Sequence, residues 1–177
     1  NYIELLYTHD TDTVIGWLKT VFSCMDAKLQ TMSSRVTKVE TFQNLLLFVS
    51  GCPDVTTEHA QNCALAAVSL FREVVKVRRP DGMPTSLKIG ISSGPLCAGV
   101  VGAQSPRFSI FGDAVNTSSR MASTADSSGP NGIIVHMSET TASMLRPEFL
   151  LKMTKSRGLV LSRRGNGMEI KPCHSPC

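Results

Sequence analysis

The chain has 177 residues, which is enough for one well-buried domain and too few for two of ordinary size. Hydrophobic residues make up 42% and charged residues 18%, as in ordinary globular proteins, and the formal net charge is only +4. Because the basic residues do not interleave with aromatic ones, we expect no nucleic-acid surface. No apolar run is long enough for a membrane span.

The six cysteines show neither metal-ligand spacing nor a short disulfide framework. This usage favours a reducing, intracellular compartment, on the cytoplasmic side. No signal peptide is visible, and the sequence begins without Met. We therefore expect a piece of a larger intracellular protein.

Alternation between helical and strand-like hydrophobic patterns runs through the whole chain, with turn-forming residues between the patterns. In chain order, the expected elements are a helix over residues 14–32, a hairpin of strands over 35–42 and 45–50, a helix over 59–77, a second hairpin of strands over 87–91 and 96–101, a strand over 107–111, a helix to about residue 125, a loop over 127–131, a strand over 132–135, a helix over 138–145, and strands near 149–153 and 159–161. This order indicates an α+β fold, with one mostly antiparallel sheet and helices packed on a face.

Local signals refine several of these boundaries. Asp12 or Thr13 is expected to cap the first helix. The tight turn of the first hairpin falls on Gln43-Asn44. In the second hairpin the small residue Gly99, like its neighbours at positions 98 and 102, suggests a close approach of backbones.

The stretch from residue 107 to residue 123 joins a short strand to a helix, and Asp113 is expected to be the N-cap of that helix. Asn116 and Arg120 are four residues apart, so they project from one face of it. An amide beside a guanidinium suits a ligand with hydroxyls and phosphates. Two solvated residues on an exposed helix face would show the same pattern.

Three stretches, in order along the chain, resemble the catalytic domain of class III nucleotide cyclases, nearest to the guanylate cyclase branch. Residues 38–41 read Lys-Val-Glu-Thr, like the start of the family's first hairpin. Residues 88–102 are similar to the family's next strand pair, and residues 106–121 contain Phe-Gly-Asp-x-Val-Asn-x-x-Ser-Arg-Met. The resemblance implies a ferredoxin-like α/β sandwich over residues 1–170, with a tail over 171–177. It also implies a head-to-tail dimer with active sites at the interface.

The family's reaction is attack of the ribose 3′-hydroxyl on the α-phosphate of a nucleoside triphosphate, assisted by two Mg²⁺ or Mn²⁺ ions. The resemblance places Asn116 on the ribose and Arg120 on the transition-state charge. Glu40 and Ser109 fall at the two positions that read the base. A carboxylate suits the donors of guanine, and serine can also serve guanine, so GTP is favoured over ATP without excluding ATP.

The metal and triphosphate positions depart from the family pattern. The family has two metal aspartates, one on its first strand and one in the Gly-Asp turn of the first hairpin. Here that turn is Gln43-Asn44, so Asn44 is a degenerate metal position, and alignment places the first-strand aspartate before Asn1, leaving that strand incomplete. Near the C-terminus Arg163 and Arg164 resemble the triphosphate-binding Lys-Gly-Lys-Gly turn in a shifted register. The alternative interpretation, a basic turn that is exposed to solvent and binds nothing, agrees equally well with these two arginines.

Three functions follow from this combination. The first is a catalytically impaired cyclase domain, a pseudoenzyme, that acts as a structural or regulatory dimerisation module. The second is one half of a heterodimeric guanylate cyclase, which supplies Asn116 and Arg120 to another cyclase-type domain. The third is an active homodimeric guanylate cyclase that tolerates Asn44. Nucleotide binding separates the first function from the other two.

Overall fold

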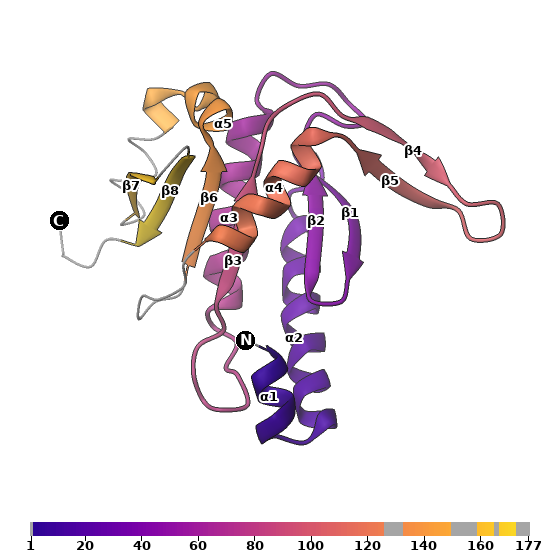
Figure 1. Cartoon of the computed structure of the whole chain (residues 1–177), viewed down its shortest axis with the longest axis vertical. Coiled ribbons are helices and arrows are strands. Elements are labelled where there is room, and N and C mark those ends of the chain that lie inside the picture. Colours follow the sequence, from indigo (N-terminus) through magenta and orange to yellow (C-terminus); the bar gives the residue numbers. More distant parts are fainter. Residues whose placement is uncertain (1, 126–132, 150–158, 165–166, 173–177) are drawn as a thin grey trace.

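The computed structural model describes residues 2–125, 133–149, 159–164 and 167–172 (Figure 1). The elements in chain order are α1 (Tyr2–Thr8), α2 (Thr11–Gln30), β1 (Thr37–Phe42), β2 (Leu45–Val49), α3 (His59–Val74), β3 (Leu87–Ile91), β4 (Cys97–Val101), β5 (Arg107–Phe111), α4 (Asp113–Thr124), β6 (Ile133–Ser138), α5 (Glu139–Met144), β7 (Leu159–Arg164) and β8 (Gly167–Pro172). The loop expected over residues 127–131, and residues 150–153 of an expected strand, lie outside the described residues.

Most of the strand pairing is antiparallel. Four strands form a sheet in the order β3-β6-β8-β7, and β1 pairs with β2 as β4 pairs with β5. Among the described strands only β3 and β6 run parallel. The expected α+β class of the ferredoxin-like type, with mostly antiparallel strands and helices packed on them, is confirmed. The expectation of one sheet is wrong, because the described strands form three separate sheets.

The helix α3 is buried on two sides and joins the two halves of the core. Its face with Ala60 and Ala64 packs against the four-stranded sheet in one cluster with Val135. Its other face packs Leu70 against Met25 of α2. Small side chains on α3 let the sheet approach closely, and the regular spacing of apolar residues on α2 explains why that helix could be expected from sequence.

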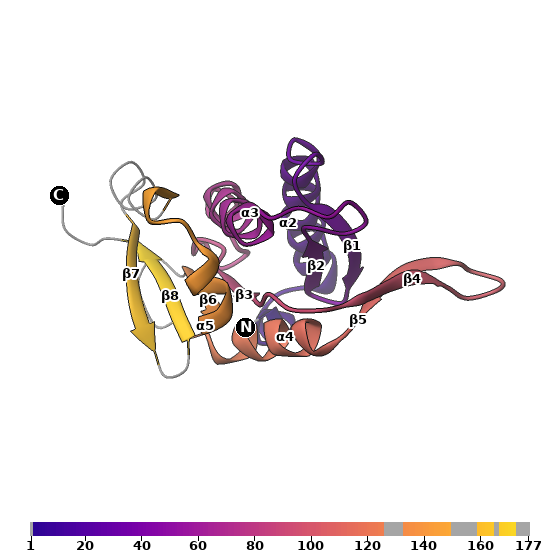
Figure 2. The same cartoon turned by 90° about the horizontal axis from the view of Figure 1, so that it is seen from above.

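The helix α4 lies on the opposite side of β3 from α3 (Figure 2). It contacts both β3 and β6. β3 and β6 are thus covered by α3 on one face and by α4 on the other, while α2 packs against α3. This layered arrangement holds one side of α4 against the fold and leaves the other side in solvent.

The prediction of a second hairpin, formed by the strands over residues 87–91 and 96–101, is wrong. β3 does not pair with β4; it pairs in parallel with β6, while β4 pairs with β5 in an arm that extends away from the body of the molecule (Figures 1 and 2). The reason is burial. Ile89 and Ile91 of β3 are buried in the core, whereas Val100 and Val101 of β4 are exposed. The residues between the strands therefore carry the chain out of the core.

Both ends of the chain also differ from expectation. Residues 2–8 form the helix α1, in which Leu5 is buried, and not the remainder of a first strand. At the other end β8 runs to Pro172, so the sheet extends into the expected tail. Ile170 is buried in the core, which explains why this strand forms.

The cap of α2 lies two or three residues earlier than expected. Asp10, and neither Asp12 nor Thr13, is the N-cap residue, and its carboxylate accepts a hydrogen bond from the Thr13 backbone N–H at 3.0 Å. The Thr13 hydroxyl donates to the same carboxylate, which makes this start of the helix the better satisfied one. Across the described ranges, none of the helices is both long and apolar enough to cross a membrane.

Candidate functional site

A turn that depends on glycine sets the start of α4. Gly112 follows β5 with φ +147°, a backbone conformation that side chains disfavour. A Cβ at this position would lie 2.9 Å from the carbonyl oxygen of Pro95, so the turn also closes tightly on the chain before β4. Gly112 is itself the N-cap, because its carbonyl accepts the first helical hydrogen bonds. The expectation that Asp113 is the N-cap is therefore wrong. Asp113 is the first helical residue, where its charge suits the helix dipole.

Asn116 and Arg120 lie on the exposed face of α4. Both side chains are exposed, and neither forms a hydrogen bond or ion pair with another described residue. Val115, Met121 and Ala122 on the other side of the helix are half-buried. The expectation that the amide and the guanidinium project together from one open face is confirmed, and both are free to contact a ligand or a partner.

The buried side of α4 is seated by two residues that the sequence analysis did not single out. Gly90 of β3 lies so close that a Cβ would overlap the backbone of Ser118 and Ala122. His136 of β6 is buried, and its Nδ1 lies 3.2 Å from the Met121 carbonyl oxygen. Two features of the sequence could have pointed to these residues: a glycine in the middle of the apolar strand that contains Gly90, and a single histidine in the apolar strand that contains His136. Conversely, Gly99 has no atom within 4 Å of a Cβ position, so the close approach expected there is wrong. At Gly102 the expectation is confirmed, because a Cβ would lie 2.7 Å from the carbonyl oxygen of Ser105.

The two expected base-reading residues come from strands that the fold brings together. Glu40 is exposed on β1, and Ser109 is half-buried on β5, where its register partner is Gly99. β1 and β5 contact each other in the folded chain. Because α4 follows β5 directly, Ser109 lies on the strand that leads into the helix that carries Asn116 and Arg120.

The tip of the β1–β2 hairpin is formed by Gln43 and Asn44, as expected. Gln43 has φ +52°, and both side chains are exposed. Amides replace the carboxylate that the resemblance requires at this turn. Among the described residues, no group of three or more His, Cys, Asp or Glu side chains is placed to hold a metal ion.

Arg163 and Arg164 end the strand β7, opposite Met168 and Gly167 of β8. β7 is the outer strand of the sheet at the end away from β3, on which α4 packs. Within one chain the fold therefore does not bring the backbone of these two arginines to the exposed face of α4.

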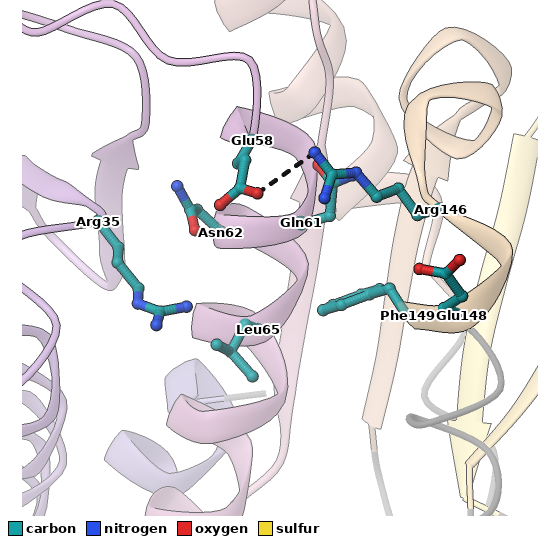
Figure 3. Close-up of a pocket in the computed structure, with 8 residues that line it drawn as sticks. All are labelled: Arg35, Glu58, Gln61, Asn62, Leu65, Arg146, Glu148 and Phe149. Atoms are coloured by element: carbon teal, nitrogen blue, oxygen red, sulfur yellow. Dashed lines mark ion pairs between the residues drawn. The ribbon is translucent and has the colours of Figure 1, made fainter.

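A surface pocket of about 190 Å³ lies elsewhere, against the first turns of α3 (Figure 3). Arg35 and Phe149 lie on opposite sides of it, and Leu65 forms part of its floor. Glu58 and Arg146 form an ion pair there at 3.3 Å. Since opposite charges compensate each other in the pocket and no expected site residue lines it, the exposed face of α4 is the better candidate site.

Comparison with known proteins gives the family directly. The family model for the adenylate and guanylate cyclase catalytic domain matches residues 1–170. Guanylate cyclase 32E of Drosophila melanogaster is 37% identical over 148 residues, which cover 82% of this chain. The chain spans only 12% of the length of that relative.

Solved structures agree. The guanylate cyclase domain of RhGC from Catenaria anguillulae in complex with GTP is 26% identical with a TM-score of 0.74, covering 96% of this chain and 88% of that one. A non-canonical dimeric guanylyl cyclase domain of the RhoGC fusion protein from the aquatic fungus Blastocladiella emersonii is 28% identical with a TM-score of 0.73, covering 96% of this chain and 88% of that one. From its motifs, its fold and these matches, the chain belongs to the family of adenylate and guanylate cyclase catalytic domains.

Proposed function

We propose that the chain is a cyclase domain of a larger intracellular protein that is catalytically impaired by itself and acts as a structural or regulatory dimerisation module. The observation that carries this proposal is the hairpin tip, where Gln43 and Asn44 present only neutral amides. Cyclase catalytic domains generally depend on divalent metal ions, and Mg²⁺ is bound in proteins mainly through carboxylates. The donors at this tip do not fit such an ion, so we derive no catalytic step through one.

The dimerisation part of the proposal rests on exposed apolar surface. Val100 and Val101 on the β4–β5 arm are 69% and 53% exposed, and Phe111 at the base of the arm is 54% exposed. A two-stranded ribbon is at best marginally stable by itself in water. Apolar side chains gathered on such a ribbon favour a covering partner. The similarity to a dimeric guanylyl cyclase domain supports another cyclase domain as that partner.

The exposed face of α4 favours a second candidate function, one half of a heterodimeric guanylate cyclase. In this function a partner that retains both metal aspartates would hold the ions. This chain would supply Asn116 to the ribose and Arg120 to the charge that develops on the phosphates. Glu40 and Ser109 favour GTP over ATP, and the related domain crystallised with GTP is consistent with that preference. Arg163 and Arg164 are proposed triphosphate contacts.

An activity assay separates the candidates. The purified chain is incubated with GTP or ATP and Mg²⁺ or Mn²⁺, alone and mixed with a cyclase domain that carries both metal aspartates. The dimerisation module forms no cyclic nucleotide in any mixture. Turnover that appears only in the mixture, and that Arg120→Ala abolishes while Asn44→Asp changes it little, identifies the heterodimer half. Robust turnover by the chain alone would contradict both candidates.

The dimer is tested separately, by sedimentation of the chain alone and with the partner domain. Val101→Asp places a charge on the arm and should weaken association about tenfold or more, because the charge would be desolvated in the interface. Val55→Asp is the matched control, since Val55 is 93% exposed and belongs to the loop between β2 and α3 and not to the arm. Equal effects of the two variants would remove the arm from the proposed interface.

A further inference from the structure

His136 is a buried polar residue for which the proposed function has no use. It is 6% exposed and lies on β6, next to the fully buried Val135 and Met137. Its ring points at the last turn of α4. There Nδ1 lies 3.1 Å from the hydroxyl of Thr124 and 3.2 Å from the carbonyl oxygen of Met121.

These contacts bear on which ring nitrogen carries a proton. The Met121 carbonyl can only accept a hydrogen bond, so a hydrogen bond to it requires the proton on Nδ1. The Thr124 hydroxyl lies 2.9 Å from the carbonyl oxygen of Arg120 and 3.2 Å from that of Met121, and it can donate to either. Among the described residues, Nε2 is buried without a hydrogen-bond partner.

The second residue that positions α4 on the sheet is Gly90, the direct register partner of His136 on the neighbouring strand β3. Without a side chain there, the backbone of α4 rests on β3 at Ser118 and Ala122. Gly90 thus sets how near the helix lies to the sheet. His136 contacts the carbonyl oxygen of Met121, the residue after Arg120, which also accepts the Ala125 backbone N–H at 3.1 Å. The ring thereby ties the last turn of α4 to the sheet.

We infer that His136 is a positioning residue: its Nδ1–H holds the last turn of α4 against the sheet and thereby fixes where Arg120 is presented. Arg120 itself makes no contact with the histidine; the link runs through the Thr124 hydroxyl and the helix backbone. The inference takes only the role of Arg120 from the second candidate function, the heterodimer half. Its tests require no nucleotide, so their failure and the failure of the proposed function are distinguishable.

The first test reads the proton directly. Two-dimensional ¹⁵N–¹H NMR of the full chain labelled at the histidine rings distinguishes a ring protonated at Nδ1 from one protonated at Nε2. We expect His136 to show the neutral form with the proton on Nδ1. Thr124→Val should shift the His136 ring signals, whereas Thr124→Ser, which keeps the hydroxyl, should restore them. A ring protonated at Nε2 would overturn the inference.

The second test measures the helix. His136→Leu keeps the bulk but removes the donor, and we expect hydrogen exchange of the amides in residues 121–125 to speed up about fivefold, as for loss of one typical hydrogen bond. His136→Asn returns an N–H near the position of Nδ1 and should restore slow exchange. Thr85→Val is the control: Thr85 is 4% exposed and hydrogen-bonded to Trp17, away from α4. If His136→Leu changes exchange in α4 no more than Thr85→Val does, the histidine is only a core residue and the inference fails.

Discussion

Gly90→Ala is the sharpest test of how α4 is held. The added Cβ would overlap the backbone of Ser118 and Ala122 and lie 3.0 Å from the Ser118 carbonyl carbon. Non-bonded carbon atoms prefer separations of about 3.5–4.0 Å, so the helix would have to retreat from β3 by roughly 0.5–1 Å for this carbon alone, and further to clear the nearer Ser118 carbonyl oxygen. Overpacking of this kind costs about 1–3 kcal/mol, and the upper end applies here because a helix backbone cannot rotate away as a side chain can.

The gain from stiffening the unfolded chain, about 0.4–1 kcal/mol, offsets part of that cost. We therefore expect Gly90→Ala to lower the free energy of unfolding by about 2–3 kcal/mol and the melting temperature by roughly 5–10 °C. Gly99→Ala is the matched control. Gly99 is also a strand glycine, but no atom lies within 4 Å of its Cβ position, so stability should stay the same or rise slightly. Urea denaturation of both variants measures this, and equal stability of the two would refute the close seating of α4 on β3.

Three further predictions concern other parts of the chain. The exposed Cys97 should react with iodoacetamide at pH 8 in the native protein. Burial raises the pKa of Cys63 to about 12, so Cys63 should react only when the protein unfolds. Mass spectrometry of the labelled native chain measures both reactions, and early labelling of Cys63 would contradict this reasoning. Hydrogen bonds from Thr13 hold the pKa of Asp10 below its ordinary value, so the stabilisation is present above about pH 4 and is lost as the pH falls through the lower folded value. The stability difference between wild type and Asp10→Asn should accordingly shrink between pH 6 and pH 2 in denaturant titrations, and a constant difference would exclude this cap. Arg120→Ala should change the free energy of unfolding by less than about 0.5 kcal/mol, because the side chain is exposed, and a larger loss in thermal melts would show that Arg120 has a structural role.

The sequence by itself determined the elements whose signals are local. The apolar spacing of α2 and α3 and the alternation around Gln43-Asn44 identified two helices and a hairpin close to their observed bounds. The spacing of Asn116 and Arg120 was sufficient to place both on one face of α4, because helical geometry alone relates residues four apart. The family motifs were readable for the same reason, since each of them is a short continuous stretch.

The tertiary structure alone decided which strands pair and how closely the layers approach. β3 and β4 each have a strand pattern, but only the burial of Ile89 and Ile91 directs β3 to β6 and leaves β4 to form the arm. The contact between β1, which carries Glu40, and β5, which carries Ser109, joins strands that are distant in the chain. The position of α4 on the sheet likewise depends on contacts between residues distant in the chain. Gly90 lets the backbone of α4 approach β3, and His136 contacts the carbonyl oxygen of Met121. Such contacts are set by the packing of the whole core, and no local pattern of residues encodes them.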